Sequence, residues 1–142
     1  MPQKISKRLL EIVDALPLKN KMRVLEIGCG PGVAAREIAS RFKDIFVLAI
    51  DRSAIAIAQA EKNSIAEIEH GKLKFLHYKV EEFKLQNNEE LYDIAFAIRV
   101  GSLDGRHPEI EEAAIQNIKK ALKRNGKLFI DGGNPIKQLN LR

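Results

Sequence analysis

Apolar positions recur along this chain with two different spacings. At residues 5, 9, 12, 13 and 16 the spacing is three or four, which predicts an amphipathic helix that Pro17 ends. Short, largely apolar runs at 23–27, 45–50, around 73–75, 92–100 and 127–131 are typical of strands buried on both faces. Between them we expect helices at 33–42, after Ser53 as N-cap, and at 109–122.

Strands and helices thus alternate five times, which predicts an α/β fold that is doubly wound, with a mainly parallel five-stranded sheet and helices on both faces. Two local signals add detail. Ser64 and Glu67 have the spacing of a capping box, and Asn125-Gly126 indicates a turn before the fifth strand. No repeat or linker divides the chain, so we expect a single domain over residues 1–142.

Composition narrows the class of protein. The chain has 142 residues, of which 45% are hydrophobic and 30% charged, the balance of a globular domain with its own core. No apolar run is long enough for a membrane span, and Glu11 and Asp14 interrupt any signal-peptide pattern. The single cysteine, Cys29, favours a cytoplasmic location. The net charge of +5 comes from scattered residues, so nucleic acid is the less favoured partner.

Residues 24–32, VLEIGCGPG, contain the strongest chemical signal. The glycines at 28, 30 and 32 follow a strand and precede a helix, where bare backbone N–H groups can bind a ligand. The dinucleotide fingerprint G-x-G-x-x-G requires a small residue at position 33, where this chain has Val33. A nicotinamide dinucleotide is therefore disfavoured.

Two acids indicate another ligand. Glu26 stands at the carboxyl end of the first strand, which suits a ligand with a positive group better than a pyrophosphate. Asp51 ends the second strand, where a carboxylate can accept both hydroxyls of a ribose. A strand-end salt bridge for Glu26 and a helix N-terminal role for Asp51 are the structural alternatives. Together with the glycine loop, the two acids favour a cationic nucleoside.

VLEIGCGPG followed by AIDRS resembles the class I S-adenosylmethionine-dependent methyltransferases, from the first helix to the fifth strand. The resemblance implies the strand order 3-2-1-4-5, with an N-terminal helix at 1–20, a Rossmann-like core at 21–131 and a tail at 132–142. It also implies that S-adenosyl-L-methionine is the cofactor and that a methyl group is transferred to an acceptor. The implied cofactor-binding residues are Glu26, Gly28, Cys29, Gly30, Gly32, Asp51, Arg52, Val80, Glu81 and Arg99.

This sequence departs from the family in two places. After the third strand, the acid that usually contacts adenine is replaced by Lys79, while the small apolar neighbour is kept as Val80; Glu81 or Glu82 could supply the acid if the loop shifts. The family sheet normally has seven strands, and this chain apparently lacks the sixth and seventh. The bare edge of the fifth strand would then favour a homodimer.

The acceptor is not readable from these motifs, and we expect a small-molecule substrate. Asp104 and His107, in the loop after the fourth strand, are the weak candidates for a general base, which is needed only if the acceptor must lose a proton. Cys29 has no activating partner, and no cluster resembles a metal site. An RNA methyltransferase and a non-catalytic S-adenosylmethionine-binding domain are the alternatives.

Overall fold

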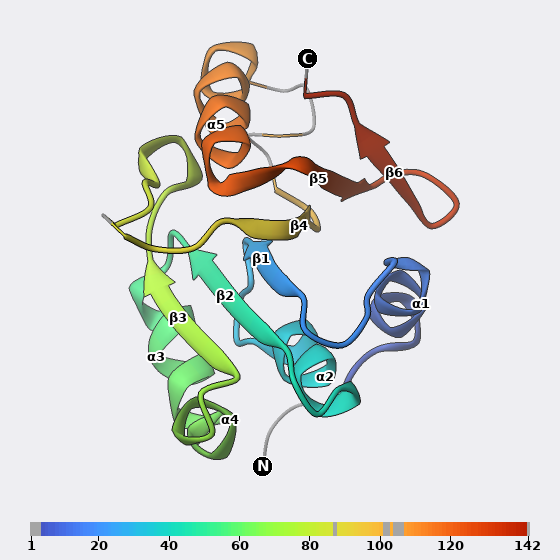
Figure 1. Cartoon of the computed structure of the whole chain (residues 1–142), viewed down its shortest axis with the longest axis vertical. Coiled ribbons are helices and arrows are strands. Elements are labelled where there is room, and N and C mark those ends of the chain that lie inside the picture. The colour runs from blue at the N-terminus through green and yellow to red at the C-terminus, as the bar shows by residue number, and fades with distance from the viewer. Residues whose placement is uncertain (1–3, 87, 101–102, 104–106, 142) are drawn as a thin grey trace.

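Six strands form one sheet, and helices cover both of its faces (Figure 1). The computed structural model describes residues 4–86, 88–100, 103 and 107–141. The elements are α1 (Lys7–Ala15), β1 (Arg23–Ile27), α2 (Val33–Arg41), β2 (Phe46–Asp51), α3 (Ala54–Lys62), α4 (Ile65–Glu69), β3 (Leu73–His77), the 3-10 helix η1 (Val80–Glu82), β4 (Tyr92–Ala97), α5 (Pro108–Ala121), β5 (Leu122–Asp131) and β6 (Ile136–Leu139).

The sheet has the order β3-β2-β1-β4-β5-β6. The first five strands are parallel, so the predicted order 3-2-1-4-5 and the doubly wound α/β class are confirmed. In this register Glu26 lies between Ala49 of β2 and Phe96 of β4, at the centre of the sheet. The carboxyl ends of β1, β2 and β4 therefore meet at one edge, where a ligand site is expected in an open α/β sheet.

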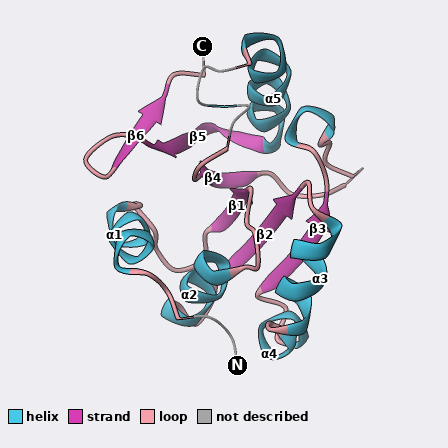
Figure 2. Cartoon of the chain, turned by 180° about the vertical axis from the view of Figure 1, so that it is seen from behind, coloured by secondary structure: helices cyan, strands magenta, loops and turns pink. Residues whose placement is uncertain are grey.

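Alternate residues of each strand pack into two separate cores. Helices α1, α2 and α3 cover one face, where Val24, Val47 and Phe96 share a core with Ile38 of α2. Helix α5 covers the other face, where Leu25 and Ile50 share a core with Ile118 (Figure 2). Burial of both faces explains why the central strands are apolar at nearly every position. In the described part of the chain, no helix has the length and hydrophobicity to cross a bilayer.

The end of the sheet differs from the sequence prediction. Residues 136–139, expected to belong to a tail, form β6, which pairs antiparallel with β5 and places Lys137 opposite Ile130. The sheet therefore has six strands instead of five, and the edge of β5 is covered within the chain. This pairing removes the reason for predicting a homodimer, and the oligomeric state stays a prediction.

Two local predictions were only partly right. Asn125-Gly126 does not separate two elements, because β5 already begins at Leu122; it lies in a bulge where residues 122–127 of β5 face only 92–94 of β4. Ser64 is the N-cap of α4, but its side chain makes no cap hydrogen bond. Its Oγ instead accepts a hydrogen bond from Arg36 Nη1 at 3.0 Å. Ser53, in contrast, caps α3 as predicted, accepting from Ala56 N at 3.1 Å.

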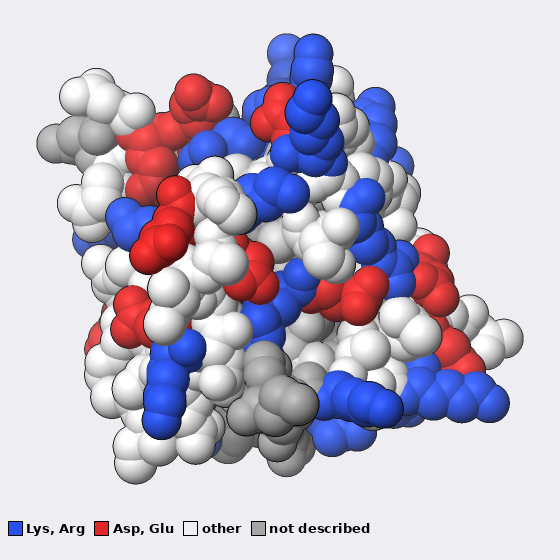
Figure 3. All heavy atoms as spheres, turned by 90° about the horizontal axis from the view of Figure 1, so that it is seen from below, with Lys and Arg blue, Asp and Glu red and all other residues white. Residues whose placement is uncertain are grey.

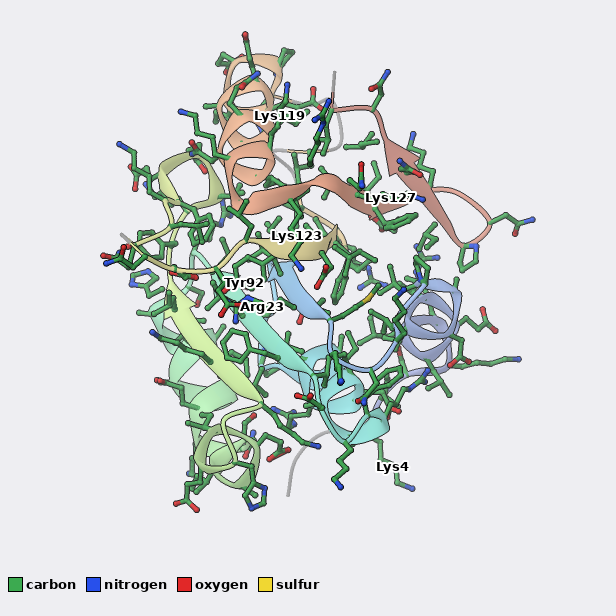
Figure 4. The ribbon with its side chains drawn as sticks, viewed as in Figure 1. Lys4, Arg23, Tyr92, Lys119, Lys123 and Lys127 are labelled. Carbon is green, nitrogen blue, oxygen red and sulfur yellow. The ribbon has the colours of Figure 1, made fainter. Side chains whose placement is uncertain are left out.

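A stacked arginine lies at the amino ends of three central strands. The guanidinium of Arg23 lies 4.8 Å from the ring centroid of Phe46 and 4.6 Å from that of Tyr92, which it adjoins in Figure 4. The Tyr92 hydroxyl donates to Glu89 at 2.8 Å. Cation–π contact and hydrogen bonding thus tie together the start of three strands, far from the carboxyl-end site.

Candidate functional site

The glycine loop connects β1 to α2 in a conformation that few other residues adopt. Gly28, Gly30 and Gly32 have φ values of 74°, 54° and 85°. A Cβ on Gly28 would lie 2.6 Å from Val100 Cγ2, and one on Gly32 would lie 2.8 Å from Phe75 Cζ. Backbone conformation and internal packing therefore require glycine at both positions. At Gly30 a Cβ would meet nothing within 4 Å.

Asp51 fastens this loop to the next crossover. Its Oδ2 accepts a hydrogen bond from Gly30 N, and its Oδ1 accepts one from Ser53 N, both at 2.8 Å. Behind it, His77 Nε2 lies 2.9 Å from the carbonyl oxygen of Arg52. The carboxylate is thus fixed at the end of β2, and each of its oxygens keeps a lone pair for another donor.

Glu26 is a buried acid without a full set of partners. It is only 4% exposed, and its Oε1 has no hydrogen-bond partner. Its pKa is raised to about 8, first by burial and then by the charge of Asp51, while Arg36 opposes both. A buried carboxylate that lacks a partner is costly. Since Glu26 also lines a cavity, it is suited to receive a cationic group there.

Arg36 stabilises the glycine loop through its hydrogen bonds. Its Nη1 donates to the carbonyl oxygen of Pro31 at 2.8 Å and to Ser64 Oγ at 3.0 Å. This side chain therefore links the glycine loop to the start of α4, and its charge lies close enough to Glu26 to lower the pKa of that carboxyl. Sequence reasoning missed Arg36, because nothing in the local pattern distinguishes it from a surface arginine.

A first cavity of about 240 Å³ opens between the glycine loop and α1. Glu26, Gly28 and Cys29 form its inner wall, while Arg8 and Leu9 of α1 form its outer wall. The predicted amphipathic helix thus has a second use, because it also closes one side of the site. On the α1 side of this cavity, Ser6 and Arg8 are the lining residues that have polar side chains.

A second cavity, of about 570 Å³, lies on the other side of Gly28. Asp51 and Arg52 line it from β2, Lys79, Val80 and Glu81 line it from the segment after β3, and His107 lines it from the start of α5. Glu82 does not line this cavity. The wall is a mixture of apolar groups and both signs of charge, as expected for a polar ligand with a flat apolar part.

Asn117 of α5 holds the wall formed by η1. Its Nδ2 donates to the carbonyl oxygens of Val80 at 3.1 Å and Glu81 at 2.8 Å. These two hydrogen bonds fix the backbone of the segment that contains Lys79, Val80 and Glu81. Asn117 itself was not predicted, because a single asparagine in a helix gives no sequence signal.

Gly28 and Arg99 line both cavities and therefore mark their junction. Arg99 follows β4 with a φ of 57°, and its N–H donates to Asp131 Oδ1 at 3.2 Å. Asp131 Oδ2 in turn lies 3.5 Å from Arg8 Nη2. Asp131 was also missed, although it ends a strand in the same way as Asp51 and the same rule could have found it.

The structure thus brings most of the predicted site residues together. Those that line the two cavities are Glu26, Gly28, Cys29, Asp51, Arg52, Val80, Glu81, Arg99 and His107. Gly30 and Gly32 do not line either cavity, and they act through the loop conformation described above. Asp104 lies outside the described residues.

Cys29 lines the first cavity, but its thiol is not activated. The thiol of Cys29 is buried, and its pKa is raised by burial first and then by the charges of Glu26 and Asp51. A thiol in this environment stays protonated and is a poor nucleophile, which agrees with the sequence interpretation. Across the described ranges, no group of three or more acidic, histidine or cysteine side chains is arranged to hold a metal ion.

Comparison with known proteins gives a consistent family. Residues 24–126 match a protein family described as "Methyltransferase domain". An O-methyltransferase of Pyrenophora dematioidea is 31% identical over 85% of this chain and 43% of its own length. The ubiquinone biosynthesis O-methyltransferase of Rickettsia typhi is 28% identical over 86% of this chain and 45% of its own length. The chain therefore spans less than half the length of these curated relatives.

Solved structures share the fold. The [4+2]-cyclase SpnF superimposes with a TM-score of 0.71 and 25% identity, over 87% of this chain and 43% of that one. A SAM-dependent methyltransferase of Thiobacillus denitrificans, in complex with S-adenosyl-L-homocysteine, superimposes with a TM-score of 0.69 and 23% identity, over 89% of this chain and 48% of that one.

Proposed function

The chain belongs to the methyltransferase domain family, and we propose that it binds S-adenosyl-L-methionine and catalyses transfer of its methyl group to a small-molecule acceptor. The observation that carries this proposal is Glu26. A carboxyl group that is 4% exposed, has an unpartnered oxygen and faces a cavity fits the ammonium of an amino acid. Asp51 in the adjoining cavity fits a ribose.

The chain's own residues would divide the cofactor between the two cavities. Glu26 accepts from the ammonium in the first cavity, and Gly28, which lines both cavities, borders the ligand where it passes from one to the other. In the second cavity, Asp51 accepts from the ribose hydroxyls with the lone pairs that Gly30 and Ser53 leave free. Arg52 and Val80 border the space for adenine. Glu81 also lines this cavity, which supports the proposal that it replaces the acid usual in the family.

When bound, this cofactor supplies a methyl group on a cationic sulfur. A nucleophile can attack the methyl carbon in line, and the sulfur is the leaving group. The protein's contribution is orientation and exclusion of water, because well-oriented reactants can gain on the order of 7 to 11 kcal/mol. His107 lines the second cavity, which Arg99 also lines, and it stays an untested candidate for a general base. Asp104 stays an untested candidate.

Binding of the cofactor product tests the first half of this proposal. Isothermal titration calorimetry with S-adenosylhomocysteine is expected to show one site per chain. Replacing Asp51 by alanine removes hydrogen bonds to a charged acceptor, worth about 1.5 to 3 kcal/mol each, so the affinity should fall at least about tenfold. A folded sample that does not bind S-adenosylhomocysteine would refute cofactor binding, and an unchanged affinity in Asp51→Ala would refute the ribose assignment.

A non-catalytic S-adenosylmethionine-binding domain is the second candidate. Lys79 in the second cavity, where the family usually has an acid, motivates it. The likeness to a protein named a [4+2]-cyclase adds that this fold is not limited to one reaction. Methyl transfer to any acceptor in a screen with radiolabelled S-adenosylmethionine would eliminate this candidate.

An RNA acceptor has less support. The chain carries a net charge of +5, but Figure 3 shows lysine and arginine interspersed with aspartate and glutamate over one face. Binding to RNA that weakens steeply with salt would favour it, and absent or salt-insensitive binding would dismiss it. A cytoplasmic location, predicted from the single cysteine, belongs with these proposals.

A further inference from the structure

We propose that the methyl acceptor is a carboxylate-bearing small molecule and that Arg99, predicted from the sequence as a cofactor-binding residue, instead selects the acceptor by binding its carboxylate. The inference rests on the proposed function, because it uses the first cavity as the methionine side and the second as the nucleoside side of the cofactor. With that division, the sulfur would lie where the cavities meet, and Arg99 is the charged residue that lines both.

The backbone holds Arg99 at this junction in an uncommon conformation. Its φ is 57°, and a positive φ in a residue other than glycine is rare and often found at functional sites. The N–H of Arg99 donates to Asp131 Oδ1 at 3.2 Å, which ties the end of β4 to the end of β5. The backbone that positions this side chain is therefore held in place by a hydrogen bond.

The described acids near Arg99 have other partners. Among the described residues, no carboxylate forms an ion pair with it. Asp131 is already shared between the Arg99 N–H and Arg8, whose Nη2 lies 3.5 Å away. Both oxygens of Asp51 accept from backbone N–H groups, and Glu26 is the partner proposed for the cofactor's ammonium.

The remaining charges of the two cavities favour the same conclusion. Arg8 lines the first cavity, and Arg52 and Lys79 line the second, against Glu81 as the remaining acid there. The cofactor's own carboxylate would enter the first cavity beside its ammonium, where Arg8 is the cation that lines this cavity alone, and its sulfonium adds a positive charge at the junction. An acceptor with a carboxylate would therefore be attracted, and a cationic amine would be repelled. Arginine suits this role because its planar fork matches both oxygens of a carboxylate.

Matched pairs of acid and amide test the selection. The protein is saturated with S-adenosylhomocysteine and titrated with para-hydroxybenzoate or para-hydroxybenzamide, and in parallel with cinnamate or cinnamamide, by calorimetry. We expect the wild-type protein to prefer each acid over its amide. In Arg99→Gln the preference should fall about tenfold, because a hydrogen bond to a charged group is lost. Arg99→Lys should keep part of the preference.

Arg124→Gln is the matched control. Arg124 lies in the β5 bulge, is exposed and lines neither cavity, so this variant changes the net charge equally and should leave the preference unchanged. Three results would each overturn this inference and leave the proposed function standing. They are equal affinity for acid and amide, no binding of either acid, and a preference that survives in Arg99→Gln. A folded protein that does not bind S-adenosylhomocysteine would remove the proposed function, and this inference with it.

Discussion

Replacing Glu26 by glutamine changes one buried acid and should change how stability depends on pH. The folded protein raises the pKa of Glu26 from 4.5 to about 8, chiefly by burial and then by the charge of Asp51, while Arg36 lowers it. Between these pH values the folded protein holds a proton that the unfolded chain releases. The free energy of unfolding must therefore fall as the pH rises from below 4.5 to above 8.

The size of this effect follows from the pKa change. At about 1.4 kcal/mol per pH unit, a rise from 4.5 to about 8 corresponds to about 5 kcal/mol. That is a large share of the roughly 5 to 15 kcal/mol by which a domain is stable. The contribution of Glu26 is complete at acid pH, where the group is neutral in both states, and is lost once the pH passes the folded pKa.

Urea denaturation at a series of pH values, without cofactor, measures the difference. We expect the stability of the wild-type protein to decline toward pH 8 relative to Glu26→Gln, which has no proton to lose, and the variant to be the more stable one at higher pH. Glu61→Gln, on the exposed surface of α3, is the control and should follow the wild-type curve. Parallel curves for the wild-type protein and Glu26→Gln would refute the argument from burial.

Two further predictions concern the same loop. Alanine at Gly32 places a Cβ 2.8 Å from Phe75 Cζ, so Gly32→Ala should lose about 1 to 3 kcal/mol more stability than Gly71→Ala, which has a similar positive φ but open space; equal losses in chemical denaturation would contradict the packing argument. The affinity for S-adenosylhomocysteine should rise as the pH rises toward 8, because an ammonium requires the ionised form of Glu26. Calorimetry in buffers of different ionisation enthalpy should detect the released proton, and its absence would speak against the Glu26–ammonium pairing.

Strands buried on both faces were predictable from sequence, and the edge strand β6 was not. Residues 45–50 and 92–97 are apolar because both faces of their strands are covered, so the pattern identifies them. Strand β6 is four residues long, with none of its residues buried, so it has neither an apolar run nor a strict alternation. Its pairing with β5 depends on tertiary context.

Some residues of the candidate site were predictable from sequence, and others were not. Glu26 and Asp51 were found because each lies at the carboxyl end of a buried strand, a position that has a general meaning in α/β sheets. Arg8 and Asn117 were not found, because their roles depend on where α1 and α5 pack. The predicted capping hydrogen bond of Ser64 is missing because Arg36, 28 residues away in sequence, donates to its hydroxyl instead.

The two hydrogen bonds of Asp51 bear on the rate of ligand binding. Because Gly30 N and Ser53 N hold the carboxylate before any ligand arrives, a ribose can use its free lone pairs without breaking either bond. The loop then needs no slow ordering step, and association should be limited by diffusion into the cavity. Specificity for the nucleoside would accordingly be expressed in how slowly it leaves.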